Sequence, residues 1–252
     1  MSLKYLELKN LSNKYSKLVF ILHGYGADAK DLQSIATYWQ RFLPEVYFCL
    51  PNAPNICQIN PHGFEWFDLM QTDEKKIVEE SLISLKKLEE LIVNKLKIFN
   101  LKYKDLFMVG FSQGTMVSIQ YAISQKKEIA GVLGYSGKIF DYDLFVKKLK
   151  SRPRIKFLHG NIDEIVPVEE MYKAVDFLKL NEFNVYHKVY ENLGHSISPE
   201  GLSEGLNFIK KEIFSARGKK KIFIYKYRKN RSYLSRSSNK KKNIYPALWR
   251  YH

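Results

Sequence analysis

The stretch DLFMVGFSQG, residues 105–114, decides the fold expected of this chain. A mostly apolar run leads to Ser112, and an amphipathic helical pattern follows at residues 113–124. Gly110 and Gly114 suit a sharp strand-to-helix turn, where crowded backbone leaves little room for side chains. The pattern predicts a nucleophile elbow, with the serine hydroxyl beside a helix N-terminus that favours a developing anion. The alternative is an ordinary glycine-rich turn.

Short apolar runs alternate with longer amphipathic stretches on both sides of this turn. Most runs are continuous, as expected for strands buried on both faces of a parallel sheet, and the intervening stretches have helical spacing. We expect strands at residues 18–22, 46–50, 106–109, 131–135, 155–158 and 185–190, and helices at 32–42, 73–99, 113–124, 144–149, 167–180 and 199–214. This order predicts a three-layer α/β fold, with a mostly parallel central sheet and helices on both faces.

Ligands of such sheets bind beyond the carboxyl ends of the strands, so the loops after the strands are the candidates for function. Residues 51–69 are expected to form a long, aromatic-rich loop, and long loops in compact domains often have a functional role.

A serine hydroxyl is a weak nucleophile and needs a histidine base oriented by an acid, in the chain order nucleophile, acid, histidine. Asp163 fits this order, because it ends the turn HGNID (159–163) directly after an expected strand. Asp141 and Asp143 follow the preceding strand and are weaker alternatives. The alternative is a structural role for Asp163, as a loop residue or as a cap of the helix near residue 167.

Of the six histidines, His195 alone satisfies both the chain order and a loop position, since it follows the expected strand 185–190 and precedes the last helix. The others precede Ser112, lie in or at the end of an expected strand, or end the chain: His23, His62, His159, His187 and His252. The sequence therefore favours His195 as the base.

Acyl transfer also needs N–H groups that stabilise the oxyanion of the tetrahedral intermediate. One donor should be the backbone N–H of Gln113, directly after the nucleophile, and the other should come from the loop after an early strand. Residues 18–22 lead into HGYGAD (23–28), whose glycines allow close backbone approach. The same residues also fit a structural turn in which Asp28 caps a helix.

The net charge of +15 is concentrated at one end of the sequence. Residues 217–252 contain 13 Lys and Arg and no acid, so residues 1–216 hold 28 basic and 26 acidic residues and are almost neutral. We expect a folded α/β domain at 1–216 and a basic, disordered tail at 217–252. A weak tether to anionic membranes, or a segment that orders against the domain, are the alternatives for the tail. No nucleic-acid partner is expected.

Cys49 and Cys57 have no neighbouring histidine cluster, which favours free or buried thiols in a reducing compartment over a zinc site or a disulfide. The N-terminal residues contain no apolar signal-peptide core, and no apolar run approaches the roughly 18 residues that span a bilayer. These features predict a soluble, cytoplasmic protein.

Together the motifs resemble the carboxylesterase/phospholipase family that includes the acyl-protein thioesterases. The matching segments are LHGYGAD (22–28), PNAP (51–54), WFD (66–68), GFSQG (110–114), HGNIDEIVP (159–167) and GH (194–195), in the family's order and over about residues 15–214. The resemblance implies an α/β-hydrolase fold without a large lid domain. It also implies a triad of Ser112, Asp163 and His195, and an oxyanion hole from the N–H groups of Tyr25 and Gln113. Tyr25 stands where leucine is common, and the segment from residue 217 is foreign to the family.

The resemblance further implies hydrolysis of carboxylic esters, lysophospholipids or thioesters of acylated proteins. Acyl transfer through a serine requires no metal or organic cofactor. Phe64, Trp66, Phe67 and Met70 are candidates for an apolar acyl site, although aromatic clusters are more often core. An inactive hydrolase scaffold that acts as a binding protein is the alternative, and the presence of all the catalytic residue types argues against it.

Overall fold

The computed structural model describes residues 2–10, 13–211 and 213, and the structural statements below concern these residues. The chain divides into residues 1–211 and residues 212–252. The predicted tail at 217–252 lies outside the described residues, as do residues 212 and 214 of the helix expected at 199–214.

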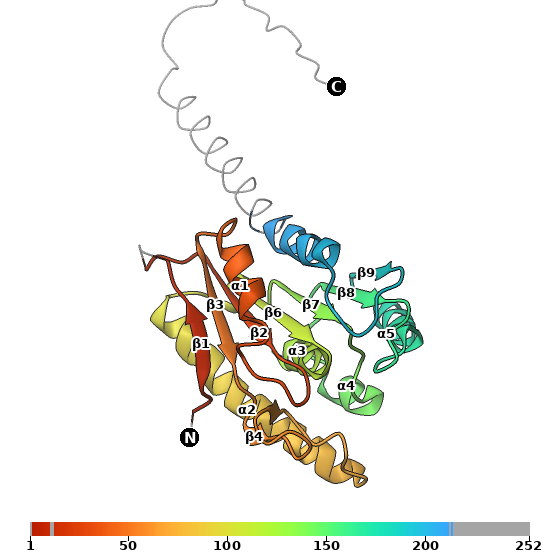
Figure 1. The fold of residues 1–252 in the computed structure, drawn as a ribbon. Coiled ribbons are helices and arrows are strands. Elements are labelled where there is room, and N and C mark those ends of the chain that lie inside the picture. The colour runs from red at the N-terminus through yellow and green to blue at the C-terminus, as the bar shows by residue number, and fades with distance from the viewer. Residues whose placement is uncertain (1, 11–12, 212, 214–252) are drawn as a thin grey trace, which may run out of the picture. The chain divides into compact units, whose positions relative to one another are not determined.

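Within the described part of the chain, a seven-stranded sheet with the order β1-β3-β2-β6-β7-β8-β9 forms the centre of the fold (Figure 1). All neighbouring strands in this sheet are parallel except β1 and β3, so the prediction of a mostly parallel sheet is confirmed. The strands are β1 (Tyr5–Leu8), β2 (Lys17–Leu22), β3 (Val46–Pro51), β6 (Leu106–Phe111), β7 (Gly131–Tyr135), β8 (Ile155–Gly160) and β9 (Val185–Tyr190).

The predicted strands are all present, with differences at their ends. β6 continues to Phe111 and β8 to Gly160, because these residues still pair with the neighbouring strand. β1 was not predicted from the sequence, because its four residues are too few for a clear pattern. Residues 51–69 were expected to form a loop, whereas β4 (Asn55–Ile56) and β5 (Phe64–Glu65) form a small antiparallel pair within this segment.

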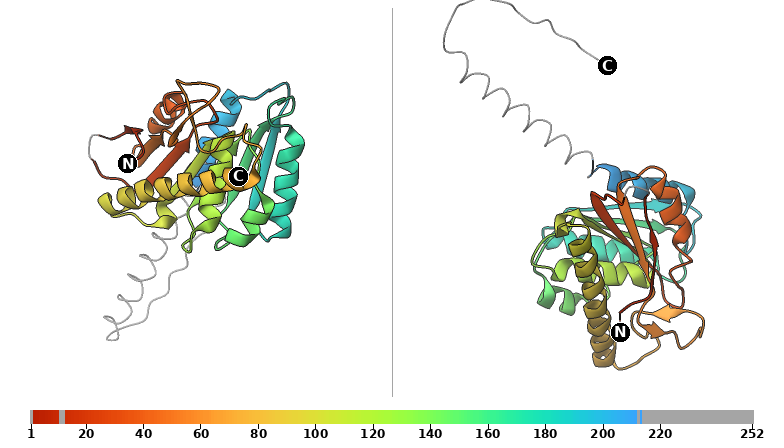
Figure 2. Two further views of the ribbon diagram at one scale, coloured as in Figure 1. Left: turned by 90° about the horizontal axis from the view of Figure 1, so that it is seen from below. Right: turned by 90° about the vertical axis from the view of Figure 1, so that its left-hand side faces the viewer.

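Helices cover both faces of the sheet, which confirms the three-layer prediction (Figure 2). α1 and the helix at residues 199–211 lie on one face, where the indole N–H of Trp39 donates to the carbonyl of Leu202 at 3.0 Å. The other helices lie on the opposite face. The helices are α1 (Gln33–Gln40), α2 (Glu74–Ile98), α3 (Gln113–Ser124), α4 (Tyr142–Lys148) and α5 (Val168–Leu180), with a short 3-10 helix η1 at Tyr103–Asp105. None of the described helices has the length and apolarity needed to cross a membrane.

Local sequence determines where the helices begin. Asp73 caps α2 by accepting a hydrogen bond from the N–H of Lys75 at 3.0 Å. Pro167 was expected as the first residue of α5, but it occupies the N-cap position in an extended conformation, one residue before the helix. Pro199 is the first helical residue of its helix, as predicted, where the missing N–H costs nothing.

The strand order places a topological switch point between β2 and β6. β2 continues through α1 to β3 on one side, whereas β6 continues through α3 to β7 on the other. Leu22 pairs with Gly110, so the loops that follow the two strands diverge from neighbouring positions. Crevices at such points are the usual ligand sites of open α/β sheets. The fold therefore brings the glycine loop after β2 beside the serine turn after β6.

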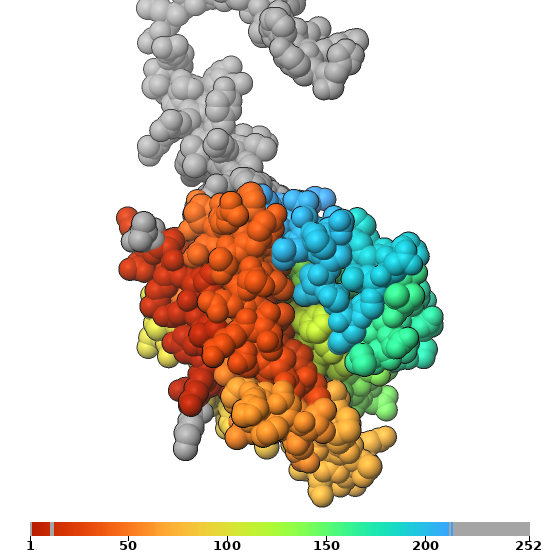
Figure 3. Space-filling view, in the orientation of Figure 1, coloured from red at the N-terminus to blue at the C-terminus, as the bar shows by residue number. Residues whose placement is uncertain are grey.

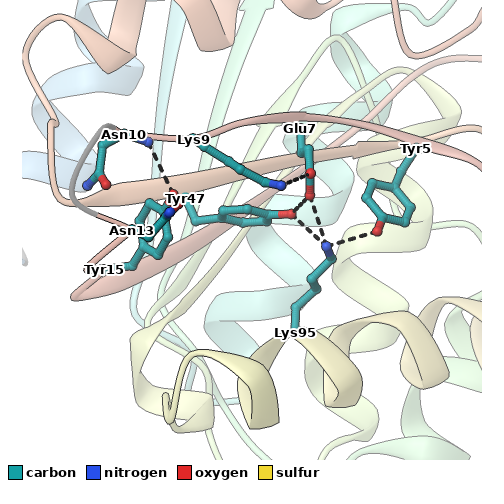
Figure 4. A network of polar contacts seen from close by, with 8 residues as sticks. All are labelled: Tyr5, Glu7, Lys9, Asn10, Asn13, Tyr15, Tyr47 and Lys95. Atoms are coloured by element: carbon teal, nitrogen blue, oxygen red, sulfur yellow. Dashed lines mark hydrogen bonds and ion pairs between the residues drawn. The ribbon is translucent and has the colours of Figure 1, made fainter.

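A buried lysine ties the edge of the sheet to the helix layer (Figure 4). Lys95 of α2 is 6% exposed, and its ammonium donates to the Glu7 carboxylate at 3.0 Å, the Tyr47 hydroxyl at 2.6 Å and the Tyr5 hydroxyl at 3.0 Å. The Tyr47 hydroxyl also donates to Glu7. Because Tyr5 and Glu7 belong to β1 and Tyr47 to β3, the network fastens the antiparallel strand to its neighbours.

The charge state of Glu7 follows from these contacts. Burial raises the pKa of Glu7, but the hydrogen bonds from Lys9, Tyr47 and Lys95 outweigh burial and lower this pKa from 4.5 to about 2. A lowered pKa means that the ionised carboxylate stabilises the fold above about pH 4.5. This contribution is lost as the pH falls through about 2.

We expect Glu7→Gln to lower the free energy of unfolding by about 1–3 kcal/mol at pH 7, because Lys95 stays buried without its counter-charge while Glu7 itself is partly exposed. Urea unfolding measures this change. The control is Lys9→Met, because Lys9 pairs with the other Glu7 oxygen at an exposed position, where ion pairs contribute about 0–1 kcal/mol. Equal losses in the two variants would contradict the role given to Lys95.

Candidate active site

Ser112 lies in a strained turn between β6 and α3. Its φ of 53° and ψ of −118° fall in a region that residues with a side chain rarely adopt. The Ser112 N–H donates to the Tyr135 carbonyl at 2.9 Å, and the Thr115 hydroxyl lies within hydrogen-bond distance of the same carbonyl and of the Gly110 carbonyl. These bonds hold the strained conformation in place.

The two glycines of the motif are required by backbone packing. A Cβ atom at Gly110 would lie 2.3 Å from the backbone of Gly114 and Thr115. A Cβ atom at Gly114 would lie 2.1 Å from the carbonyl oxygen of Leu22 in β2. The start of α3 is thus packed against the ends of both β2 and β6, which explains the spacing of glycine around Ser112.

Two backbone N–H groups, one in the glycine loop and one directly after the serine, remain without a backbone partner in the part of the chain that the structure describes. Among the described residues, neither the N–H of Tyr25 nor that of Gln113 takes part in a backbone–backbone hydrogen bond. The Ser112 hydroxyl makes no capping bond to α3. The side chain of Gln113 is buried and bridges the 66–67 segment, accepting from the Trp66 N–H at 3.0 Å and donating to the Phe67 carbonyl at 2.7 Å. These bonds fix the first turn of α3.

His23 anchors the glycine loop after β2. Its Nε2 accepts the N–H of Ala53 at 3.0 Å, so its Nδ1 carries the proton and donates to the carbonyl of Gly24 at 2.7 Å. The indole N–H of Trp66 donates to the carbonyl of His23 at 3.1 Å. Burial lowers the pKa of His23 and keeps the neutral form that this arrangement requires.

Asp163 lies between two imidazoles. Nδ1 of His195 is 2.8 Å from Oδ2 and 3.0 Å from Oδ1, and Nε2 of His159 is 3.3 Å from Oδ2. The N–H groups of Ile165 and Val166 donate to Oδ1 at 3.0 and 2.9 Å. The carboxylate of Asp163 therefore accepts hydrogen bonds on both oxygens.

The electrostatics favour an ionised Asp163. Burial raises the pKa of Asp163, but the hydrogen bonds from the Val166 N–H and from His195 lower it by more, so the net pKa lies below its usual range. Burial lowers the pKa of His159, whose Nε2 donates to the Val166 carbonyl at 2.7 Å. The alternative acid Asp141 caps α4 instead, by accepting from the N–H of Leu144 at 2.8 Å.

Two neighbours of Ser112, Phe111 and Gly24, show how the serine lies relative to this pair. The ring of Phe111 lies 4.8 Å from the ring of His195, centroid to centroid. A Cβ atom on Gly24 would lie 3.3 Å from the Cβ of Ser112. The hydrogen bonds of the described residues join Asp163 to His195 but include none from the Ser112 hydroxyl to the imidazole. Catalytic hydrogen bonds to the nucleophile are often long without substrate and shorten when it binds.

The expected acyl-site residues do not surround the cleft next to His195. Trp66 and Phe67 are fully buried in the core, where their backbone groups bind Gln113. Phe64 packs against the core, and Met70 is 59% exposed. None of the four lines the cleft at His195, which is formed by other residues. The described residues contain no group of three or more His, Cys, Asp or Glu side chains arranged to hold a metal ion. Both cysteines are free and buried, as predicted.

A model of the phospholipase/carboxylesterase family matches residues 3–213. The chain belongs to this family. It is similar to acyl-protein thioesterase 1 of Gibberella zeae, with 27% identity over 80% of this chain and 93% of the relative. It is also similar to acyl-protein thioesterase 1 of Aspergillus fumigatus, with 30% identity over 79% of this chain and 89% of the relative.

Solved structures agree with the family assignment. Esterase PE8 is 27% identical, covers 84% of this chain and 99% of its own, and superposes with a TM-score of 0.78. SOBER1 of Arabidopsis thaliana covers 78% of this chain and 99% of its own, with a TM-score of 0.69 and 23% identity, and this similarity concerns the fold alone. Family membership confirms the predicted α/β-hydrolase fold and the predicted hydrolase of ester or thioester bonds. It does not favour an inactive scaffold.

Three contributors to the site in this phospholipase/carboxylesterase chain were not predicted from the sequence. His159 contacts Asp163, the His23 ring holds the glycine loop, and the Gln113 side chain holds the 66–67 segment. The four-residue spacing of His159 and Asp163 was visible in the sequence. The other two roles depend on contacts between segments that are distant in the chain, which no local pattern indicates.

We expect Ser112→Gly to raise the free energy of unfolding by about 1 kcal/mol, because glycine removes backbone strain of about 1–3 kcal/mol at this φ while costing chain entropy. Thermal and urea unfolding measure this change. Ser124→Gly, at the other end of α3, should be destabilising, because no strain is relieved there. A loss of stability in Ser112→Gly would show that the turn is not strained.

Proposed function

We propose that Ser112, His195 and Asp163 form a catalytic triad that hydrolyses carboxylic esters or thioesters. The observation that carries this proposal is the 2.8 Å hydrogen bond between His195 Nδ1 and Asp163, beside a serine in a strained strand-to-helix turn. This bond places the imidazole proton on Nδ1 and leaves Nε2 free to act as a base. The lowered pKa of Asp163 supports a carboxylate that stays ionised at neutral pH.

Acylation begins when Nε2 of His195 takes the proton of the Ser112 hydroxyl and the serine oxygen attacks the carbonyl carbon. The tetrahedral intermediate then collapses, and its C–O or C–S bond breaks. The imidazolium, stabilised by Asp163, gives its proton to the departing alcohol or thiol, and the acyl group remains bonded to Ser112.

Deacylation repeats these steps with water. His195 takes a proton from the water molecule, whose oxygen attacks the acyl-enzyme, and the second intermediate releases the carboxylic acid. The Ser112 oxygen takes the proton back from the imidazolium. No metal, redox or organic cofactor enters this balance.

We assign the oxyanion hole to the backbone N–H groups of Tyr25 and Gln113. Their absence from the backbone–backbone hydrogen bonds of the described residues supports this assignment. Each donor also has a buried anchor, which is the His23 ring for the loop of Tyr25 and the side chain of Gln113 for the start of α3. Donors held rigidly before the reaction stabilise the oxyanion without reorganisation.

The substrates that we propose are esters and thioesters with an apolar acyl group. The names of the relatives support acylated protein thioesters and simple carboxylic esters, and the family description supports lysophospholipids. Two further proposals come from the sequence alone: a cytoplasmic location, and weak contact of residues 217–252 with anionic membranes.

We expect Ser112→Ala to abolish hydrolysis of p-nitrophenyl butyrate, a loss of at least about 10³-fold, because no other group takes over nucleophilic attack. A fluorophosphonate probe, which reacts only with activated serines, should label the parent protein and not this variant. Ser124→Ala, at the end of the same helix, is the matched control. Undiminished turnover by Ser112→Ala would end the proposal.

We expect Asp163→Asn to lower kcat by about 10³- to 10⁴-fold, because an amide favours the wrong imidazole tautomer and stabilises no imidazolium. Steady-state kinetics with the same ester measure this loss. The control is Glu164→Gln at the adjacent, exposed position, which should stay within about twofold of the parent. Similar losses of kcat in both variants would mean that a disturbed loop, and not the loss of the Asp163 carboxylate, causes the effect.

A further inference from the structure

A cleft of about 530 Å³ opens beside His195. One wall comes from the glycine loop and the start of α1, within residues 23–35, and the other from residues 195–202. Figure 3 shows these segments, red-orange and blue, facing each other across a hollow with yellow-green surface between them. Phe111 also lines the cleft. Gly24 joins the cleft to the nucleophile, because a Cβ on Gly24 would lie 3.3 Å from the Cβ of Ser112.

The chemistry of the walls is mostly apolar. Leu32, Ile35, Ile197 and Leu202 supply aliphatic surface, and neither lysine nor arginine is among the described residues that line the cleft. The carboxylate of Asp31 is the acidic group of the lining. A cavity of this volume holds a small organic group, and these walls favour one that is apolar and carries no negative charge.

The position of the cleft relative to His195 identifies which part of a substrate enters it. In the tetrahedral intermediate, the reacting carbon is bonded to the serine oxygen, the oxyanion, the acyl group and the leaving group. The imidazole must protonate the leaving atom, so the leaving group lies against His195 when the bond breaks. The cleft is lined by His195 itself and by the residues that follow it, so it lies on the imidazole side of the reacting carbon.

We propose that this cleft binds the alcohol part of ester substrates and selects uncharged, apolar alcohols that are branched or cyclic. This assignment rests on the proposed roles of Ser112 and His195 as nucleophile and general acid. The alcohol leaves before the water attacks, so the cleft contributes to acylation and not to deacylation. The enzyme therefore distinguishes two isomeric esters that carry the same bulky group on opposite sides of the ester bond.

Cyclohexylmethyl acetate and methyl cyclohexylacetate are such a pair, and a pH-stat measures kcat/KM for each. We expect Ser34→Phe, which fills the cleft from an exposed position on α1, to lower kcat/KM about tenfold for the first isomer and less than about twofold for the second, since only the first loses burial of its ring. Leu202→Ala removes part of the apolar wall. It should lower kcat/KM for the first isomer, relative to that for the second, about threefold.

The control is Thr37→Phe, one turn further along α1 and outside the cleft. It should leave kcat/KM unchanged for both isomers. If Ser34→Phe lowered kcat/KM more for methyl cyclohexylacetate than for cyclohexylmethyl acetate, the acyl group would lie in the cleft and the proposal would be overturned. Equal effects on both isomers in Ser34→Phe and Leu202→Ala would also overturn it. Retained hydrolysis in Ser112→Ala would instead refute the catalytic roles, so the two failures are distinguishable.

Discussion

The contact between Gly114 and the carbonyl of Leu22 is the constraint on which the site depends. It allows the first turn of α3 to lie directly against the end of β2, closer than any side chain would permit. The chain must then turn within one residue, and Ser112 adopts a positive φ for that reason. The same approach puts Gly24 beside the serine. Ser112 and the glycine loop are therefore positioned by backbone packing.

Hydrogen bonds between uncharged groups hold the loops around this contact. His23 binds the backbone of Gly24 and Ala53, Trp66 binds the carbonyl of His23, and Gln113 binds the backbone of the 66–67 segment. The chain of bonds links three loops that are far apart in sequence. Charge enters the centre of the site through Asp163, whose partners are imidazoles and backbone N–H groups. Neutral hydrogen bonds thus hold together the loops that surround the buried carboxylate of Asp163.

The sequence predicted the architecture well, because parallel strands and amphipathic helices have strong periodic patterns. From chain order and loop position it also predicted a pairing of Asp163 with His195, and the two side chains are hydrogen-bonded. It did not predict the packing between distant segments. Trp66 and Phe67 look like pocket residues in the sequence, yet their side chains complete the core. The cleft at His195 is lined by ordinary residues of α1 and the 195–202 segment, which no local motif marks.

The short strand β1 has a consequence for the behaviour of the whole molecule. β3 is buried along its full length and consists largely of apolar residues, and without β1 its backbone would be an open template for another chain. β1 covers this template, is held down by Lys95 and is itself only four residues long, so the edge of the sheet that stays open is short. Short edge strands are a usual protection against edge-to-edge pairing, so we expect the first residues of the domain to limit self-association.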